Sequence, residues 1–292
     1  LQERFNSLAY MKPVGQQFLM VKNQKIDKDA VLFQHAFKLD SNALKEMSPI
    51  ASPKGFTQAY IESPKEKELT ERILAAKDSL SKGNDFILYE GTGHAGVGSV
   101  FDHSNAQVSK LVGSKVVIVS IGGIGKSIDE IILNHSLFEK HGVEVAGVII
   151  NKVLPEKYDK INTVVRQGLE RQGIPVLGVI PLDIELTYPT VASLVDELRP
   201  TVLSGKRGLN NTLEKFIIGD MLPHHALDIF TENTLMIVPG NREGLILTAL
   251  CENMLRPKGP RLVSGIIFTD GIKPHNKILD LLGTTRIPLL LV

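Results

Sequence analysis

The sequence predicts an α/β protein with a doubly wound, mostly parallel sheet and a second, smaller α/β domain. Three observations support this fold class: apolar runs rich in Val and Ile recur, helical stretches separate them, and the runs do not alternate polar with apolar residues. Parallel strands covered by helices on both faces have this pattern, and right-handed crossovers connect them. A chain of 292 residues is long enough for two such domains.

The first domain, residues 1–198, is predicted to contain five strands with helices between them. The strands are SLAYM (Ser7–Met11), DFILY (Asp85–Tyr89), KVVIVS (Lys115–Ser120), VAGVIIN (Val145–Asn151) and VLGVIP (Val176–Pro181). Helices are expected where apolar residues recur at three- and four-residue spacing, at 66–82, 127–141 and 157–172. The proline-interrupted segment 40–63 is expected to form a long loop or lid over the strand ends.

The second domain, residues 199–292, follows a break after Leu198 and includes a Gly- and Asn-rich stretch at 203–211. The alternation of strand and helix then restarts, which predicts a small α/β domain. Strands are expected at FIIGD (Phe216–Asp220), TLMIVP (Thr234–Pro239), VSGIIFTD (Val263–Asp270) and IPLLLV (Ile287–Val292), and helices near 223–230, 242–255 and 274–282.

Charge balance and cysteine content exclude several classes of protein. A formal net charge of +1 gives no electrostatic footprint for nucleic acid or an anionic membrane, and no apolar run is long enough to insert into a bilayer. One cysteine excludes an intrachain disulfide, so we expect a soluble protein of a reducing compartment, either the cytoplasm or an organellar matrix or stroma. Apolar chain ends and a small second domain favour a homo-oligomer or protein partners.

The segment YEGTGHAGVGS (Tyr89–Ser99) carries the strongest local pattern for a binding site. A predicted strand ends in Glu90, and glycines follow at once, among them Gly91 and Gly93. Ligands of open α/β sheets bind beyond the carboxyl ends of strands. A carboxylate at that edge is placed to hold Mg²⁺, and glycines let the backbone approach a ligand closely. The alternative is a flexible turn with a salt-bridged Glu90.

The segment KVVIVSIGGIGKSIDE has the strand–glycine loop–helix layout of an anion site. Its backbone amides at Gly122, Gly123 and Gly125, with Lys126, could hold a phosphate at the start of the following helix. The Walker pattern G-x-x-x-x-G-K-[ST] requires glycine where Ser120 stands, so this loop is not a complete phosphate loop. The alternative is a glycine turn with an exposed lysine.

Two further groups of residues stand at predicted strand ends. Asn151 could pair with a base through its amide. Lys12 could neutralise a phosphate or carboxylate, and the alternative is an ordinary exposed lysine. In the second domain Gly240, Asn241 and Arg242 join a strand to a helix and could hold an acidic ligand or effector. The alternative there is an ordinary helix cap at Asn241.

Together these motifs resemble a known branch of the P-loop proteins. YMKPVG, DFILYEGTGH, AGVIINKV and VLGVIPLD, in this order over 1–198, resemble the dethiobiotin synthetase and cobyrinic acid a,c-diamide synthase family. FIIGDM and TLMIVPGNREG are similar to the DRTGG domain. This pairing of domains resembles the N-terminal, non-transferase part of long phosphotransacetylases and their stand-alone relatives.

The resemblance implies roles for four of the residues and a chemistry for the family. Lys12 would face the phosphate and substrate region, Glu90 would be the Mg²⁺ carboxylate with Gly91 and Gly93 shaping its turn, and Asn151 would meet the nucleotide base. In that family ATP activates a carboxylate as an acyl phosphate, which an amine or ammonia then captures.

The sequence departs from the family in two places. The family opens with a strand, a G-x-x-x-x-G-K-[ST] loop and a helix, of which this sequence contains only an apparent tail at Leu1–Phe5. Two expectations stay open: the sequence is a fragment, or the phosphate loop has been lost. Gly-Asn-Arg-Glu also stands where an acidic residue is expected before the arginine of the DRTGG motif.

Three function classes follow from these patterns. The preferred expectation is a regulatory or scaffold protein that binds ATP, another nucleotide with Mg²⁺, or a small metabolite, and signals to partner subunits. The alternative is an ATP- and Mg-dependent ligase of the dethiobiotin or cobyrinic acid type, and the third class is a purely structural subunit. Nothing resembles an acetyl-transferring domain, so we expect no transferase activity in these residues.

Overall fold

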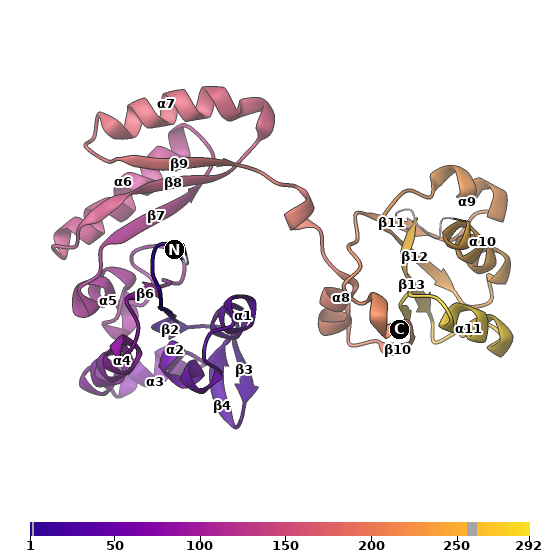
Figure 1. Ribbon diagram of the computed structural model, residues 1–292, viewed down its shortest axis with the longest axis horizontal. Helices are drawn as coiled ribbons and strands as arrows, with labels where there is room; N and C mark the ends of the chain where they lie inside the picture. Colours follow the sequence, from indigo (N-terminus) through magenta and orange to yellow (C-terminus); the bar gives the residue numbers. More distant parts are fainter. Residues whose placement is uncertain (2, 256–261) are drawn as a thin grey trace. The chain divides into compact units, whose positions relative to one another are not determined.

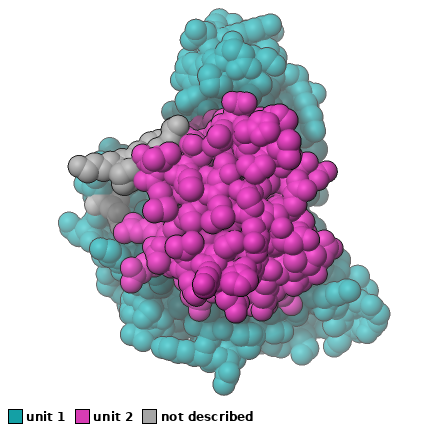
Figure 2. Space-filling view, turned by 90° about the vertical axis from the view of Figure 1, so that its right-hand side faces the viewer, with its two compact units in different colours: residues 1–182 teal, residues 183–292 magenta. Residues whose placement is uncertain are grey.

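The computed structural model describes residues 1, 3–255 and 262–292, which divide into two compact units. Unit 1 is Leu1–Leu182 and unit 2 is Asp183–Val292, coloured teal and magenta in Figure 2. The sequence pattern placed the domain boundary later, after Leu198. The structural division falls earlier along the chain because helix α8 (Val191–Leu198) packs within unit 2, where Val191 is buried in one cluster with Leu213.

A two-stranded parallel sheet in unit 1 pairs β1 (Leu8–Met11) with β6 (Phe86–Tyr89). Helix α4 (Glu66–Ser81) packs its apolar stripe into the core beside this sheet, as its three- and four-residue spacing predicts. The surrounding elements are β2 (Val14–Gly15), β3 (Phe18–Val21), β4 (Gln24–Asp27), α1 (Lys28–Phe37), α2 (Leu44–Met47), β5 (Ile50–Ala51), α3 (Phe56–Glu62) and α5 (Asn105–Val112).

The expectation of a long loop or lid over 40–63 is wrong. A 3-10 helix (Ser41–Ala43) leads into α2, β5 pairs in parallel with β2, and α3 follows. Met47, Ile50 and Tyr60 are buried in the core of this part of unit 1. Short elements with one or two core residues each are not recognised from periodicity, because the spacing of apolar residues does not repeat often enough within them.

The remaining strands of unit 1 form a separate parallel sheet in the order β7–β8–β9 (Figure 1). The elements are β7 (Val116–Ile121), α6 (Gly125–Lys140), β8 (Val145–Val153), α7 (Tyr158–Glu170) and β9 (Val176–Pro181). Helices α6 and α7 contact each other and share one core with β8, so they cover the same face of the sheet.

The opposite face of this sheet is exposed, which corrects the expectation that all strands are buried on both faces. Along β7 the burial alternates, and the side chains of Val117, Val119 and Ile121 are 45%, 61% and 67% exposed. The Val- and Ile-rich run was not diagnostic, because apolar composition alone does not say how many helical layers cover a strand.

Unit 2 contains one continuous five-stranded sheet in the order β10–β14–β13–β12–β11, all parallel except β10. Alternate residues of β12 and β13 enter two different clusters of buried side chains, so both faces of the sheet are covered. The elements are α8, β10 (Thr201–Ser204), β11 (Lys215–Ile218), α9 (Pro223–Ile229), β12 (Thr234–Pro239), α10 (Glu243–Met254), β13 (Val263–Thr269), α11 (Asn276–Gly283) and β14 (Leu289–Leu291).

Two mixed α/β units with predominantly parallel sheets confirm the predicted fold class. Over the described residues, no helix combines the length and the apolar character needed to cross a bilayer.

Candidate functional site

An ion-paired cluster lies where β1 and β6 end, side by side. Lys12 directly follows β1 and Glu90 directly follows β6, and the parallel register pairs the residues before them, Met11 with Tyr89. The Nζ atom of Lys12 lies 3.0 Å from Oε1 of Glu90 and also donates to Oδ2 of Asp29. The structure therefore brings together two of the predicted site residues, Lys12 and Glu90, and adds a third side chain.

Asp29 reaches the cluster from the first turn of α1. Asp27 caps this helix, because its side chain accepts a hydrogen bond from the amide of Asp29 at 2.9 Å. Burial raises the pKa of the Asp27 carboxyl above its ordinary value, although the Asp29 amide and Lys12 act in the opposite direction. Gly15 lies against this carboxyl, and a Cβ atom there would collide with Asp27.

Lys12 is buried, with only 6% of its surface exposed. Burial acts to lower the pKa of its ammonium, but hydrogen bonds to Asp29 and Glu90 outweigh that effect and raise the pKa above its usual value. The group therefore stays protonated at neutral pH, and its charge is balanced inside the protein.

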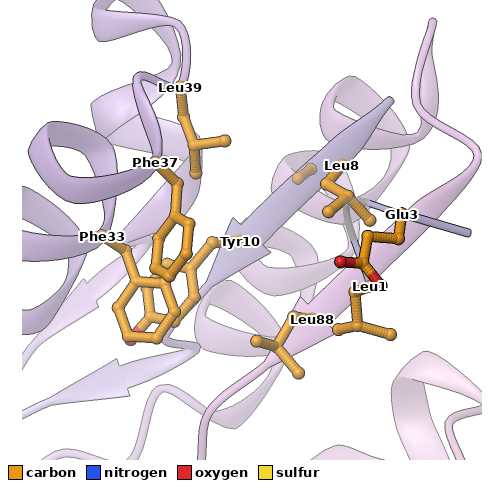
Figure 3. A pocket seen from close by; sticks show the side chains of 9 residues that line it. Leu1, Glu3, Leu8, Tyr10, Phe33, Phe37, Leu39 and Leu88 are labelled. Carbon is orange, nitrogen blue, oxygen red and sulfur yellow. The ribbon is translucent and has the colours of Figure 1, made fainter. Parts of the chain in front are cut away.

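Tyr10 fixes the other oxygen of Glu90. Its hydroxyl donates to Oε2 of Glu90 at 2.7 Å, and its ring stacks on Phe33 with centroids 4.0 Å apart. Burial and the hydrogen bond to Glu90 raise the pKa of the phenol, so the hydroxyl remains a donor. The ring also lines an apolar cavity of about 500 Å³, where Figure 3 shows it beside Phe33 and Phe37.

The turn after Glu90 has a fixed shape. Asn105 donates from its side-chain amide to the carbonyls of Thr92 and His94, at 2.9 and 2.8 Å. A Cβ atom on Gly91 would overlap the Asn105 side chain, and Gly93 has φ +66°, a conformation that favours glycine. Both glycines are therefore needed for the local backbone path.

The charges of the cluster suit a hard cation. Within the described residues, no group of three or more His, Cys, Asp or Glu side chains is arranged to hold a metal ion. Asp29 and Glu90 nevertheless share one cationic atom, Nζ of Lys12, which stands in for a cation between two carboxylates. Mg²⁺ commonly uses one or two carboxylates and takes its other oxygens from water and phosphate, so these residues fit Mg²⁺.

Asn151 belongs to a different sheet from the strands that carry this cluster. It belongs to β8, in the sheet that is not hydrogen-bonded to β1 and β6. Its side-chain oxygen accepts a hydrogen bond from the amide of Lys152 at 2.8 Å. No hydrogen bond among the described residues joins Asn151 to Lys12 or Glu90, so a base-binding role for Asn151 stays a prediction.

The predicted anion loop before α6 is packed locally. Gly122 lies against Val153, where a Cβ atom would overlap, and Gly125 begins α6. Lys126 is exposed and forms an ion pair with Glu130 at 3.6 Å. These contacts match the glycine-turn alternative, and anion binding by Gly122, Gly123, Gly125 and Lys126 stays a prediction.

In unit 2, Arg242 rather than Asn241 occupies the position before α10, and neither side chain caps the helix. The Arg242 guanidinium donates to the carbonyl of Met221 at 3.1 Å and lies 3.8 Å from Asp220. Gly240 packs so tightly against the 272–274 loop that a Cβ atom would collide with its backbone. Ligand binding by these three residues is not tested by the contacts and remains a prediction.

Sequence reasoning missed Asp29, Asp27 and Tyr10. Two signals were present: Asp27 and Asp29 flank Lys28 at a strand-to-helix junction, a typical N-cap pattern. Tyr10 lies in β1 two residues before Lys12, and residues two apart in extended backbone point to the same face.

The curated relatives include phosphate acetyltransferases and a cobyrinate synthase. The chain is 30% identical over 287 residues to the phosphate acetyltransferase of Synechocystis sp., covering 94% of this chain and 39% of that protein. The Nitratidesulfovibrio vulgaris phosphate acetyltransferase is 27% identical, over 76% of this chain and 32% of its own length. Cobyrinate a,c-diamide synthase of Caldanaerobacter subterraneus subsp. tengcongensis is 32% identical, over 32% of this chain and 20% of its own length.

These matches confirm the resemblance seen in the motifs, and the chain spans about a third of the length of the acetyltransferases it matches. Residues 193–292 match the DRTGG domain, and residues 1–190 match the family described as AAA domain. The chain therefore belongs to the AAA domain family and carries a DRTGG domain after it.

Proposed function

We propose that this chain is a regulatory or scaffold protein, related to the N-terminal region of phosphate acetyltransferases, that binds a nucleotide or small phosphorylated metabolite with Mg²⁺. The observation that carries the proposal is the Lys12–Asp29–Glu90 cluster, where two carboxylates and a protonated amine converge at the ends of two parallel strands. The carboxyl edge of a parallel sheet is where α/β proteins bind ligands.

Each residue of this site would have a separate role in binding. Asp29 and Glu90 would hold Mg²⁺, which supplies charge neutralisation to phosphate oxygens when bound. The ammonium of Lys12 would contact the ligand anion, and Tyr10 would keep Glu90 oriented through its hydrogen bond. The DRTGG domain would pass the bound state to partner subunits or to a second copy of the chain.

A second function has one specific observation in its favour, the similarity to cobyrinate a,c-diamide synthase. In this alternative the same cluster would serve an ATP-dependent ligase that activates a carboxylate. The two functions differ in turnover, because a regulatory protein binds the nucleotide without consuming it.

Calorimetric titration of the full chain with Mg-ATP, Mg-ADP and acetyl phosphate tests the proposal. We expect saturable binding of at least one of these ligands without release of inorganic phosphate. Phosphate release that depends on an added carboxylate would favour the ligase, whereas flat titrations with all three ligands would contradict nucleotide or phosphate binding and leave a structural role.

A further inference from the structure

The ammonium of Lys12 is enclosed by the groups that pair with it. Its side chain is 8% exposed, whereas the side chains of Asp29 and Glu90 are 42% and 37% exposed. A phosphate that approaches the cluster from solvent therefore meets two carboxylates before it can reach the ammonium. The negative charges of a phosphate and of the two carboxylates repel each other, so the site without a cation disfavours an anion.

The same arrangement favours a divalent cation. Two carboxylates that share one monovalent ammonium keep one excess negative charge, whereas a divalent ion in place of the ammonium would balance both carboxylates. Lysine is a compact charge on a flexible four-carbon stem, so its ammonium can leave one pair of oxygens and reach another.

Tyr10 holds Glu90 in place during such an exchange. Its hydroxyl binds Oε2 of Glu90, whereas Lys12 binds Oε1. The carboxylate keeps one fixed hydrogen bond when the ammonium leaves, and Oε1 becomes free for a cation. Tyr10 is thus a positioning residue that acts through Glu90.

From this geometry we propose that Lys12 is an internal counter-ion, which a divalent cation displaces from Asp29 and Glu90 so that the freed ammonium can contact the ligand anion. The cation then binds first, and the anion binds to the cation and Lys12 together. This inference rests on the proposed function, because it concerns the order of binding at the same site.

Binding of Mn²⁺ alone, followed by the electron paramagnetic resonance signal of the free ion, tests the exchange without any nucleotide. In the Lys12→Met variant no ammonium competes for the two carboxylates, so we expect Mn²⁺ to bind roughly tenfold or more tightly than in the unaltered chain. Lys115→Met is the matched control, because Lys115 pairs with Glu144 at 2.8 Å in an exposed position; its Mn²⁺ affinity should equal that of the unaltered chain. Equal or weaker Mn²⁺ binding by Lys12→Met would overturn the proposal.

A second measurement on the unaltered chain does not depend on the folding of a variant. Reductive methylation of Lys12, followed by mass spectrometry, should speed up several-fold when Mg²⁺ is added, since the ammonium leaves its two partners. An unchanged methylation rate at Mg²⁺ concentrations that saturate the site would contradict displacement.

The order of binding separates this inference from the proposed function. ADP should bind with Mg²⁺ and fail to bind in the presence of a chelator. Equal ADP affinity with and without the chelator would overturn the ordered exchange while leaving nucleotide binding intact. Absence of both Mn²⁺ and ADP binding would overturn the two together.

Discussion

The sheet of unit 2 and the β7–β8–β9 sheet of unit 1 are built from similar Val- and Ile-rich runs but are buried differently. All residues of β13 from Val263 to Phe268 are buried, whereas β7 alternates half-buried with exposed side chains. Unit 2 packs side chains on both faces of its sheet, and α6 and α7 cover one face in unit 1. Helical cover, rather than strand composition, accounts for the different burial of the two sheets.

The largest expected contrast comes from truncating one side chain in each sheet. Phe268 is fully buried in β13, and Phe268→Ala should lower the stability of unit 2 by about 3–5 kcal/mol. Val119 in β7 is 61% exposed, and Val119→Ala should change stability by less than about 0.5 kcal/mol. Urea unfolding followed by hydrogen exchange in each unit measures both stability changes. Each unit is followed separately because a chain with two units need not unfold in a single two-state transition. A loss at Val119 as large as that at Phe268 would show that the exposed face is covered in solution.

Glycine substitutions in the two units should also differ in their effect on stability, by a smaller amount. A Cβ atom at Gly240 of unit 2 would collide with the backbone of the 272–274 loop, so Gly240→Ala should cost about 1–3 kcal/mol. Gly178 in β9 of unit 1 has open space at that position, so Gly178→Ala should leave stability unchanged or raise it by up to about 1 kcal/mol. Melting temperatures of both variants against the unaltered chain check this contrast, and a destabilised Gly178→Ala protein would break it.

A smaller effect is expected at Tyr60, in a part of unit 1 that is well covered. Its hydroxyl donates to Oδ2 of Asp102 at 2.9 Å, and Tyr60→Phe should cost about 1 kcal/mol. Burial, together with this hydrogen bond, raises the pKa of Tyr60 to about 12 from an ordinary 10.0. The raised pKa contributes stability that is complete below pH 10.0 and is lost as the pH rises through about 12.

Titration of tyrosinate absorbance in the folded chain checks the Tyr60 prediction. One tyrosine that ionises late in the unaltered chain should be missing from the titration of Tyr60→Phe. If the two proteins gave the same absorbance curve in the pH range near 12, Tyr60 would not ionise there, and the raised pKa of its hydroxyl would be contradicted.

The local spacing of apolar residues predicted most of the helices and strands, and the ends of predicted strands gave two of the three residues of the Lys12–Asp29–Glu90 cluster. Lys12 and Glu90 were found because each follows a buried run, and parallel strands align their carboxyl ends. Asp29 could not be paired with them from sequence, since its place depends on how the β3–β4 hairpin returns the chain to the sheet. The predicted boundary after Leu198 differs from the structural division after Leu182, because the amphipathic pattern of α8 does not say which unit the helix packs with.

The Lys12–Asp29–Glu90 cluster is the feature on which the proposed function depends, and Glu90→Gln is its sharpest test. The substitution removes one negative charge and keeps the shape of the side chain. Glu144→Gln is the control, because Glu144 forms an exposed ion pair with Lys115, and neither residue belongs to the cluster. Calorimetric titration with Mg-ADP should show binding to the unaltered chain and to Glu144→Gln, and a loss of at least about tenfold in affinity for Glu90→Gln. Equal Mg-ADP affinity in all three proteins would contradict the assignment of the nucleotide site to this cluster.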